Sequence, residues 1–286
     1  MNSCNDERLL PIPKIDTNSK FLIPNSKFHN PPINLSTNPY IAANKKFMWS
    51  VCKKELRQYF SSLTGYIAII VFLLVNGLVL FVFEDNIFDF GYATLDRFFE
   101  LAPWVMLLLI PAITMRSFAD EFKAGTFEIL QTRPLSRSQI VSGKYWGSLS
   151  VVLIALIPTL VYIFSIQQLS VNEGIDTGAT IGSYIGLFFL AAVFTAIGIC
   201  MSSFTNNAVI AFITSVIACA LLYYGFSAIS RLPVFSSGAD YFIEMIGIDF
   251  HYRSISRGVI DTRDIIYFIT VIYFFLFITY SNLRKR

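Results

Sequence analysis

Residues 180–229 read TIGSYIGLFFLAAVFTAIGICMSSFTNNAVIAFITSVIACALLYYGFSAI and contain no Asp, Glu, Lys or Arg. A helix needs about 20 apolar residues, at a rise of 1.5 Å per residue, to cross a hydrocarbon core about 30 Å thick. The stretch is long enough for two such helices, and the polar residues within 203–206 predict a tight turn between them. The sequence therefore specifies at least one pair of membrane-spanning helices.

The composition extends this prediction to the whole chain. Its 286 residues are 55% hydrophobic and 14% charged, whereas an average soluble domain is about 25% charged. Such a chain is expected to be an integral membrane protein. Apolar runs without a charged residue predict six transmembrane helices and an all-α fold, with the runs at about 66–83, 101–115, 146–167, 180–202, 207–229 and 265–281.

The second run differs from the other five. Residues 101–115 are fewer than a span requires, and Pro103 and Pro111 interrupt them. Proline removes a backbone donor and clashes with the preceding helical turn. We expect a short, interrupted span whose missing length is made up by snorkelling side chains or local bilayer thinning.

Lysine and arginine predict the orientation of the spans. With the N-terminus in the cytoplasm, the cytoplasmic segments hold thirteen basic residues and the outer loops hold five. Basic residues concentrate on the cytoplasmic side of membrane proteins. We therefore expect both termini and the segment 116–145 to face the cytoplasm.

The first 44 residues differ from the rest of the chain. They are rich in Asn, Pro and Ser and show no hydrophobic periodicity, so we expect residues 1–44 to be disordered. No apolar run in them has the length of a signal peptide. Met48 is an alternative start that would remove this tail, which leaves residues 45–286 as the membrane domain.

Residues 45–60 are predicted to form a helix along the inner membrane surface. Met48, Cys52, Leu56 and Tyr59 follow helical spacing. A basic face beside such an apolar stripe suits the headgroups of an anionic leaflet, which makes membrane lipid a partner. The basic face consists of Lys46, Lys53, Lys54 and Arg57. The alternative is that these residues are only the charged flank of the first span.

The segment 116–145 is predicted to be a folded element of short helices. Gly125 and Thr126 break the first helix, and Pro134 ends the second. Ser136 can cap a third helix that continues into the third span, since Gln139 stands at the position that completes a capping box. The apolar side chains of this segment need a protein partner or a pocket within the chain, and they are Phe122, Phe127, Ile129 and Leu130.

These features resemble the permease subunit of ABC-2-type transporters. The resemblance covers about residues 46–286 and rests on six spans, Lys-Glu-Leu-Arg at 54–57, a long last outer loop, and a motif between spans two and three. That motif is Glu121-x-x-x-Gly125-Thr126-x-Glu128-x-Leu130 followed by Pro134-Leu135-Ser136. Within the family, residues 255–261 (ISRGVID) are most similar to the permease of the gliding-motility ABC transporter.

The resemblance implies a subunit of an ATP-driven exporter in the bacterial inner membrane. A separate ABC ATPase would drive it, and a second copy or a related permease would complete the pathway. The first cytoplasmic loop would be the coupling helix that docks on the ATPase. The residues implied are Glu121, Phe122, Gly125, Thr126, Phe127, Glu128, Leu130 and Pro134 for coupling, and Lys53, Lys54, Glu55 and Arg57 for the interfacial helix.

Several other classes of function find no support in the sequence. Gly143-Lys144 lacks the Gly and Ser/Thr of a phosphate-binding loop, so we expect no ATP site. Two histidines, His29 and His251, are a poor supply for a metal site or catalysis, and we read His251 as structural. A net charge of +3 gives no reason to expect nucleic acid as a partner. We expect no enzyme activity and no cofactor.

A rival interpretation is a membrane scaffold of a motility or secretion complex that transports nothing. The six apolar runs contain no ionisable residue, which disfavours a proton-coupled carrier. They fit export of a lipid, a polysaccharide or a peptide, and the sequence does not choose among these.

Overall fold

The structure is a computed structural model that describes residues 39–83, 94–131, 136–170, 175–231, 239–259 and 261–285. The chain divides into a unit Met1–Pro39 and a unit Tyr40–Arg286. The helices described below lie in the second unit, apart from the first residue of α1. Most of the expected tail 1–44 lies outside the described residues.

Helices make up 89% of the structure, and the described residues contain no strand. This confirms the all-α fold. The helices are α1 Pro39–Phe60, α2 Leu63–Phe81, α4 Asp96–Thr114, α5 Arg116–Lys123, α6 Thr126–Gln131, α7 Arg137–Leu156, η1 Ile157–Thr159, α8 Leu160–Leu169, α9 Thr177–Phe204, α10 Ala208–Ala220, the π-helical η2 Leu221–Gly225, α11 Phe226–Ser230, α12 Ala239–Ile246, α13 Ile248–Ser256 and α14 Thr262–Lys285.

Among the described residues, five helical segments are long and apolar enough to cross a membrane, and the α1–α2 pair is a sixth candidate if its two bent parts are counted as one span. The five are Asp96–Lys123, Arg137–Gln168, Thr177–Phe204, Ala208–Ser230 and Thr262–Lys285. The chain is therefore a multi-pass membrane protein. The bend of 73° between Met48–Phe60 and Gly65–Phe81 separates α1 from the apolar run of α2, as the sequence predicted.

The second span is longer and more regular than expected. Pro103 and Pro111 both lie inside the continuous helix α4, which leads directly into α5. Pro103 has no N–H for the carbonyl four residues earlier, that of Phe99. The hydroxyl of Tyr252 in α13 donates to that carbonyl at 2.8 Å. A hydrogen bond from a residue 153 positions away thus replaces the one that proline removes, and the sequence pattern could not reveal it.

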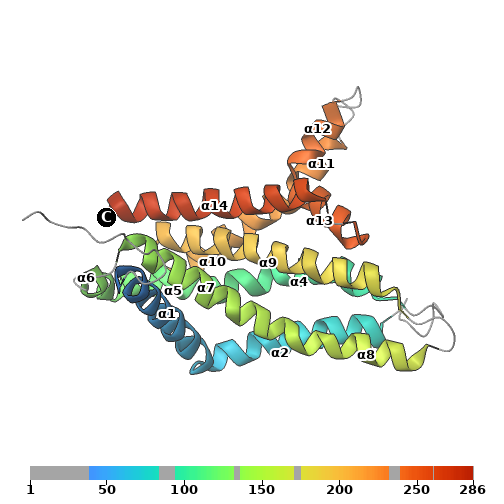
Figure 1. Cartoon of the computed structure of the whole chain (residues 1–286), viewed down its shortest axis with the longest axis horizontal. Helices are drawn as coiled ribbons and strands as arrows, with labels where there is room; N and C mark the ends of the chain where they lie inside the picture. Colours follow the sequence, from blue (N-terminus) through green and yellow to red (C-terminus); the bar gives the residue numbers. More distant parts are fainter. Residues whose placement is uncertain are drawn as a thin grey trace, which may run out of the picture. The chain divides into compact units, whose positions relative to one another are not determined.

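Helix α9 is the centre of the bundle. In the apolar stretch of α9, 78% of the residues are buried, the highest share among the candidate spans. The helix packs against α4, α7, α10, α13 and α14 (Figure 1). A Cβ at Gly198 would lie 2.1 Å from the hydroxyl of Thr114, so α9 and α4 approach closely. The predicted tight turn follows α9, and the side chain of Asn207 caps α10 by accepting from the amide of Val209 at 2.9 Å.

Short helices join the fifth and sixth spans. Helices α11, α12 and α13 follow η2, and α11 and α12 stand off from the long helices (Figure 1). Asp261 accepts from the amide of Arg263 at 2.9 Å and thereby caps the start of α14. Both α4 and α9 begin at the end of the bundle where α13 lies, and both end near α5. Helix α13 and helix α5 therefore lie at opposite ends of the bundle.

Candidate functional site

Helix α1 crosses α7 at two glycines. A Cβ at Gly143 would lie 2.7 Å from the Cβ of Val51, and a Cβ at Gly147 would lie 2.7 Å from the Cβ of Glu55. Residues four apart lie on one face of a helix, and small residues at that spacing let two backbones approach closely. This close approach places the side chain of Lys144, between the two glycines, against α1.

Lys144 is a fully buried cation, with 1% of its side chain exposed. Its ammonium donates to Glu55 Oε1 at 2.8 Å and to the carbonyl oxygen of Ser117. It also lies 3.1 Å from Glu121 Oε1 and 4.9 Å from the centre of the Phe118 ring. An ammonium has three N–H donors, and these three oxygens supply an acceptor for each of them.

One further side chain, that of Lys54, completes a cluster of four charges, which we call the charge cluster: Lys54, Glu55, Glu121 and Lys144. Lys54 donates to Glu121 Oε1 at 2.7 Å, so this oxygen lies between two ammonium groups. Two cations and two carboxylates make the charge cluster neutral. Burial of an ion is costly unless it is paired and hydrogen-bonded, so removal of one member leaves an uncompensated buried charge. The cluster ties α1, α5 and α7 to one another.

Helix α5 is also fixed to α9. The hydroxyl of Ser202 accepts from the amides of Phe118 at 3.1 Å and Ala119 at 3.2 Å, and it donates to the carbonyl of Met115 at 3.0 Å. The first turn of a helix has amides without helical partners, and here a side chain from another span supplies the acceptor. A movement of α5 would therefore act on α7 through Lys144 and on α9 through Ser202.

The break between α5 and α6 lies where the sequence predicted it. Gly125 has φ +66°, a left-handed conformation that glycine adopts without strain. Beyond it, the ring of Phe127 packs edge-on against Phe122 at 5.0 Å and against Phe118 at 6.3 Å. Of the two possibilities left open for these apolar side chains, the structure gives Phe127 a pocket within the chain, because only 6% of it is exposed.

Some of the predicted coupling residues contact other residues of this chain, whereas others are exposed at its surface. Glu121, 8% exposed, faces the charge cluster, and Phe122 is half-buried against the aromatic rings of its own segment. The hydroxyl of Thr126 donates to the carbonyl of Glu121 at 3.4 Å. Glu128 and Ile129 are exposed on α6. The side chain of Leu130 and all of Pro134 lie outside the described residues.

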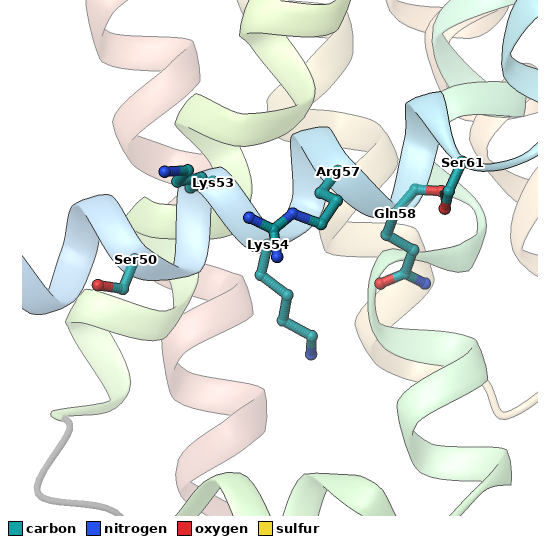
Figure 2. A pocket seen from close by; sticks show the side chains of 6 residues that line it. All are labelled: Ser50, Lys53, Lys54, Arg57, Gln58 and Ser61. Atoms are coloured by element: carbon teal, nitrogen blue, oxygen red, sulfur yellow. Dashed lines mark hydrogen bonds between the residues drawn. The ribbon is translucent and has the colours of Figure 1, made fainter.

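The predicted interfacial helix is divided in the same way. Glu55 faces the charge cluster, whereas Lys53 and Arg57 line an open pocket of about 500 Å³. Figure 2 shows the six polar side chains that line it, five from α1 and one, Ser61, directly after it: Ser50, Lys53, Lys54, Arg57, Gln58 and Ser61. On the opposite face, Val51 and Cys52 are buried in the protein. The apolar stripe of α1 therefore packs at least in part on the protein.

The start of α7 is as predicted. Ser136 accepts from the amide of Gln139 at 3.3 Å, and the amide of Ser136 donates to the side chain of Gln139 at 2.8 Å, which together form a capping box.

Lys144 is the residue that the sequence analysis missed. Gly143-Lys144 was considered only as a fragment of a phosphate-binding loop. The signal that could have identified it is Gly-Lys-Tyr-Trp-Gly at 143–147, a G-x-x-x-G spacing in a membrane helix with a lysine inside it. Glycines at that spacing indicate a close helix contact, and a lysine beside such a contact needs a carboxylate partner.

Within the part of the chain that the structure describes, no group of three or more His, Cys, Asp or Glu side chains could hold a metal ion. His251 has structural partners. Its Nδ1 lies 2.6 Å from Asp264 Oδ1, its Nε2 lies 2.9 Å from the carbonyl oxygen of Met245, and its ring stacks on Tyr267 at 3.9 Å. It thereby joins α12, α13 and α14.

Comparison with known families identifies the class of protein. The model of the family described as ABC-2 family transporter protein matches residues 49–231, more than half of the chain. The chain belongs to this family. It is therefore a permease component of an ABC transporter, and membership implies an ABC ATPase as its partner. No curated protein matches the chain.

Proposed function

We propose that this chain is the membrane subunit of an exporter driven by a separate ATPase, and that α5 and α6 receive the force of ATP binding. The observation that supports the proposal is the charge cluster. It joins α5, which the family resemblance assigns to coupling with the ATPase, to the two helices α1 and α7. A segment that transmits force must be connected rigidly to the helices it moves, and buried charges that pair across three helices contribute to such a connection.

The surface that we propose to dock on the ATPase contains fewer residues than the family resemblance implies. Glu128 and Ile129 on α6 are exposed at the surface of the chain. We assign Glu128 to a basic residue of the ATPase and Ile129 to an apolar groove on it. Glu121 and Phe127 act from inside, by holding α5 and α6 in position, because their partners lie within this chain.

The orientation follows from this assignment. We propose that α1, α5, α6 and both termini lie on the cytoplasmic side of a bacterial inner membrane, as the distribution of Lys and Arg supports. Lys53 and Arg57 then face the cytoplasm or the anionic headgroups. Two copies of the chain, or one copy and a related permease, complete the transport pathway. The similarity of residues 255–261 to the gliding-motility permease supports a role in that machinery.

Affinity purification from the native host tests the proposal. The tagged chain, solubilised in mild detergent, is expected to carry with it a protein that contains a Walker lysine, identified by mass spectrometry. Charge reversal at Glu128, combined with Ile129→Asp, is expected to abolish this co-purification. The matched control is Glu100→Lys at the other end of the same bundle, which should leave it unchanged.

Two results would overturn the proposal. If Glu128→Lys with Ile129→Asp retained the full amount of ATPase, α6 would not be the docking element. If a host whose ATPase carries a substituted Walker lysine kept every function that depends on this chain, the chain would be a scaffold and not a transporter.

A further inference from the structure

A cavity of about 920 Å³ lies at the end of the bundle opposite the charge cluster. The walls come from the N-terminal halves of α4 and α9, from η2, and from α12 and α13. Ligand pockets in proteins commonly measure about 300–1,000 Å³ and combine aromatic walls with a few charged groups. This cavity has that size, and its lining has that composition.

Aromatic rings form one part of the lining. Trp104 of α4 is 47% exposed and Tyr224 of η2 is 37% exposed, so the chain leaves part of each side chain uncovered. The Trp104 ring packs against Tyr224 at 5.6 Å and edge-on against Tyr223 at 6.0 Å. Tyr223 and Tyr224 stand in the π-helical turn η2, and such turns occur frequently at functional sites.

Carboxylates form the other part. The cavity is lined by four of them and by two guanidinium groups, and the six residues are Asp96, Glu100, Glu244, Asp249, Arg253 and Arg257. Asp249 is buried and holds the guanidinium of Arg253 through both oxygens, with one N–H at 3.0 Å. This hydrogen bond raises the pKa of Arg253. The ion pair joins one positive and one negative group, so it adds no net charge to the lining.

Among the other charged residues that line the cavity, carboxylates outnumber guanidinium groups. Asp96, Glu100 and Glu244 face the cavity with Arg257. Glu100 has a loose ion pair with Arg97 at 3.8 Å, and both side chains are exposed, so water screens that pair strongly. An anion would meet repulsion in this cavity, whereas a cation would be attracted.

The chain itself places a cation on one of these rings. The guanidinium of Arg231 lies 5.9 Å from the centre of the Tyr224 ring. A cation within about 6 Å of an aromatic centroid is attracted by the negative face of the ring. One face of the Tyr224 ring is thus already near a positive group of the chain, and the Trp104 ring beside it offers a stronger face of the same kind.

We propose that this cavity binds an organic cation, such as an amine or a quaternary ammonium group with apolar substituents. The rings of Trp104 and Tyr224 contact the alkyl groups and the charge, and Glu100 and Glu244 supply the counter-charge. The site does not depend on the proposed function, since binding to the isolated chain is an equilibrium property that needs no ATPase.

The chain offers a reporter for this site, because it has three tryptophans, Trp49, Trp104 and Trp146. In a chain with Trp49→Phe and Trp146→Phe, the only indole is the one in the cavity. Choline added to this purified chain is expected to change its emission saturably. The uncharged isostere 3,3-dimethylbutan-1-ol is expected to bind about tenfold more weakly, as the loss of a cation–π contact and a counter-charge predicts.

Variants assign the effect to the site. Glu100→Gln with Glu244→Gln is expected to weaken choline binding about tenfold, whereas Glu128→Gln at the opposite end should not change it. Tyr224→Phe keeps the ring and should keep the affinity, whereas Tyr224→Leu should lower it. A chain with Trp146 as its only indole should show no response.

Three results would overturn the proposal. Choline could fail to give a saturable change, the uncharged isostere could bind as tightly as choline, or maltose could give the saturable change in place of choline. The last result would assign the cavity to a polyhydroxylated ligand, for which the rings would be stacking surfaces and the excess of carboxylates would not matter.

Discussion

The two polar regions of this bundle use similar residues in opposite ways. In the charge cluster, two lysines and two carboxylates pair with one another, and Lys144 is 1% exposed. In the cavity at the other end, carboxylates outnumber the arginines and surround an open volume of about 920 Å³. Charges that satisfy one another hold helices together, whereas charges left in excess around an open space remain available to a ligand. The comparison assigns a mechanical role to the first region and a binding role to the second.

Substitution of Lys144 should have the largest effect. Lys144→Met leaves Glu55 and Glu121 buried without their shared cation, so the free energy of unfolding should fall by about 3–5 kcal/mol. Thermal unfolding in detergent, calibrated by SDS titration, measures the change. Lys54→Met is the control, since Lys54 is half-exposed and its loss should cost less than about 1 kcal/mol. Equal effects of the two substitutions would break the distinction between a buried and an exposed member of the charge cluster.

The contact of α1 with α7 gives the next effect. Gly143→Ala places a methyl group 2.7 Å from the Cβ of Val51, so α1 must shift, at a cost of about 1–3 kcal/mol in the free energy of unfolding. Gly225→Ala is the matched control in a helix, because its nearest neighbour would lie at 3.7 Å, an ordinary contact. If both variants unfolded at the wild-type temperature, the close approach that buries Lys144 would be wrong.

The wall of the cavity is tested by a double-mutant cycle on Pro103 and Tyr252. Tyr252→Phe leaves the carbonyl of Phe99 without a donor and should cost about 1–3 kcal/mol in the free energy of unfolding. Pro103→Ala restores an N–H for that carbonyl, so the double variant should recover most of the loss. Additive effects in the cycle would show that the hydroxyl of Tyr252 does not replace the helical hydrogen bond.

The charges of the cavity should have the smallest effect on stability. Glu100→Gln and Glu244→Gln should each change the free energy of unfolding by less than about 0.5 kcal/mol, because Glu100 is exposed, Glu244 is partly exposed, and surface substitutions rarely do more. The same thermal measurement checks this. A loss as large as that of Lys144→Met would mean that these carboxylates hold the fold, and the contrast between the two regions would disappear.

Much of the fold could be predicted from local sequence. The apolar runs, the break at Gly125 and the capping box of Ser136 depend on residues that are neighbours in the chain. The same reasoning was wrong about the second span, because the donor that supports Pro103 comes from a distant helix.

The candidate site could be predicted only in part. The sequence identified Glu55 and Glu121 but not the pairs that they form. Lys144 lies 89 positions from Glu55, and Lys54 lies 67 positions from Glu121. No periodicity connects residues at such separations. The cavity is likewise assembled from five helical segments, so its existence depends on tertiary packing. Spacing in the sequence predicts elements and their ends, but it does not predict which distant charges meet.

The central claim is that the charge cluster transmits a movement of α5 to the far end of the bundle. The most direct test uses the chain with Trp104 as its only indole, purified with its ATPase, and records the emission of Trp104 when ATP and vanadate are added. The account predicts a change in emission that Glu121→Gln abolishes, while the ATPase still co-purifies and the chain stays folded. An undiminished change in Glu121→Gln would contradict the account, since the movement would then reach the cavity without the charge cluster.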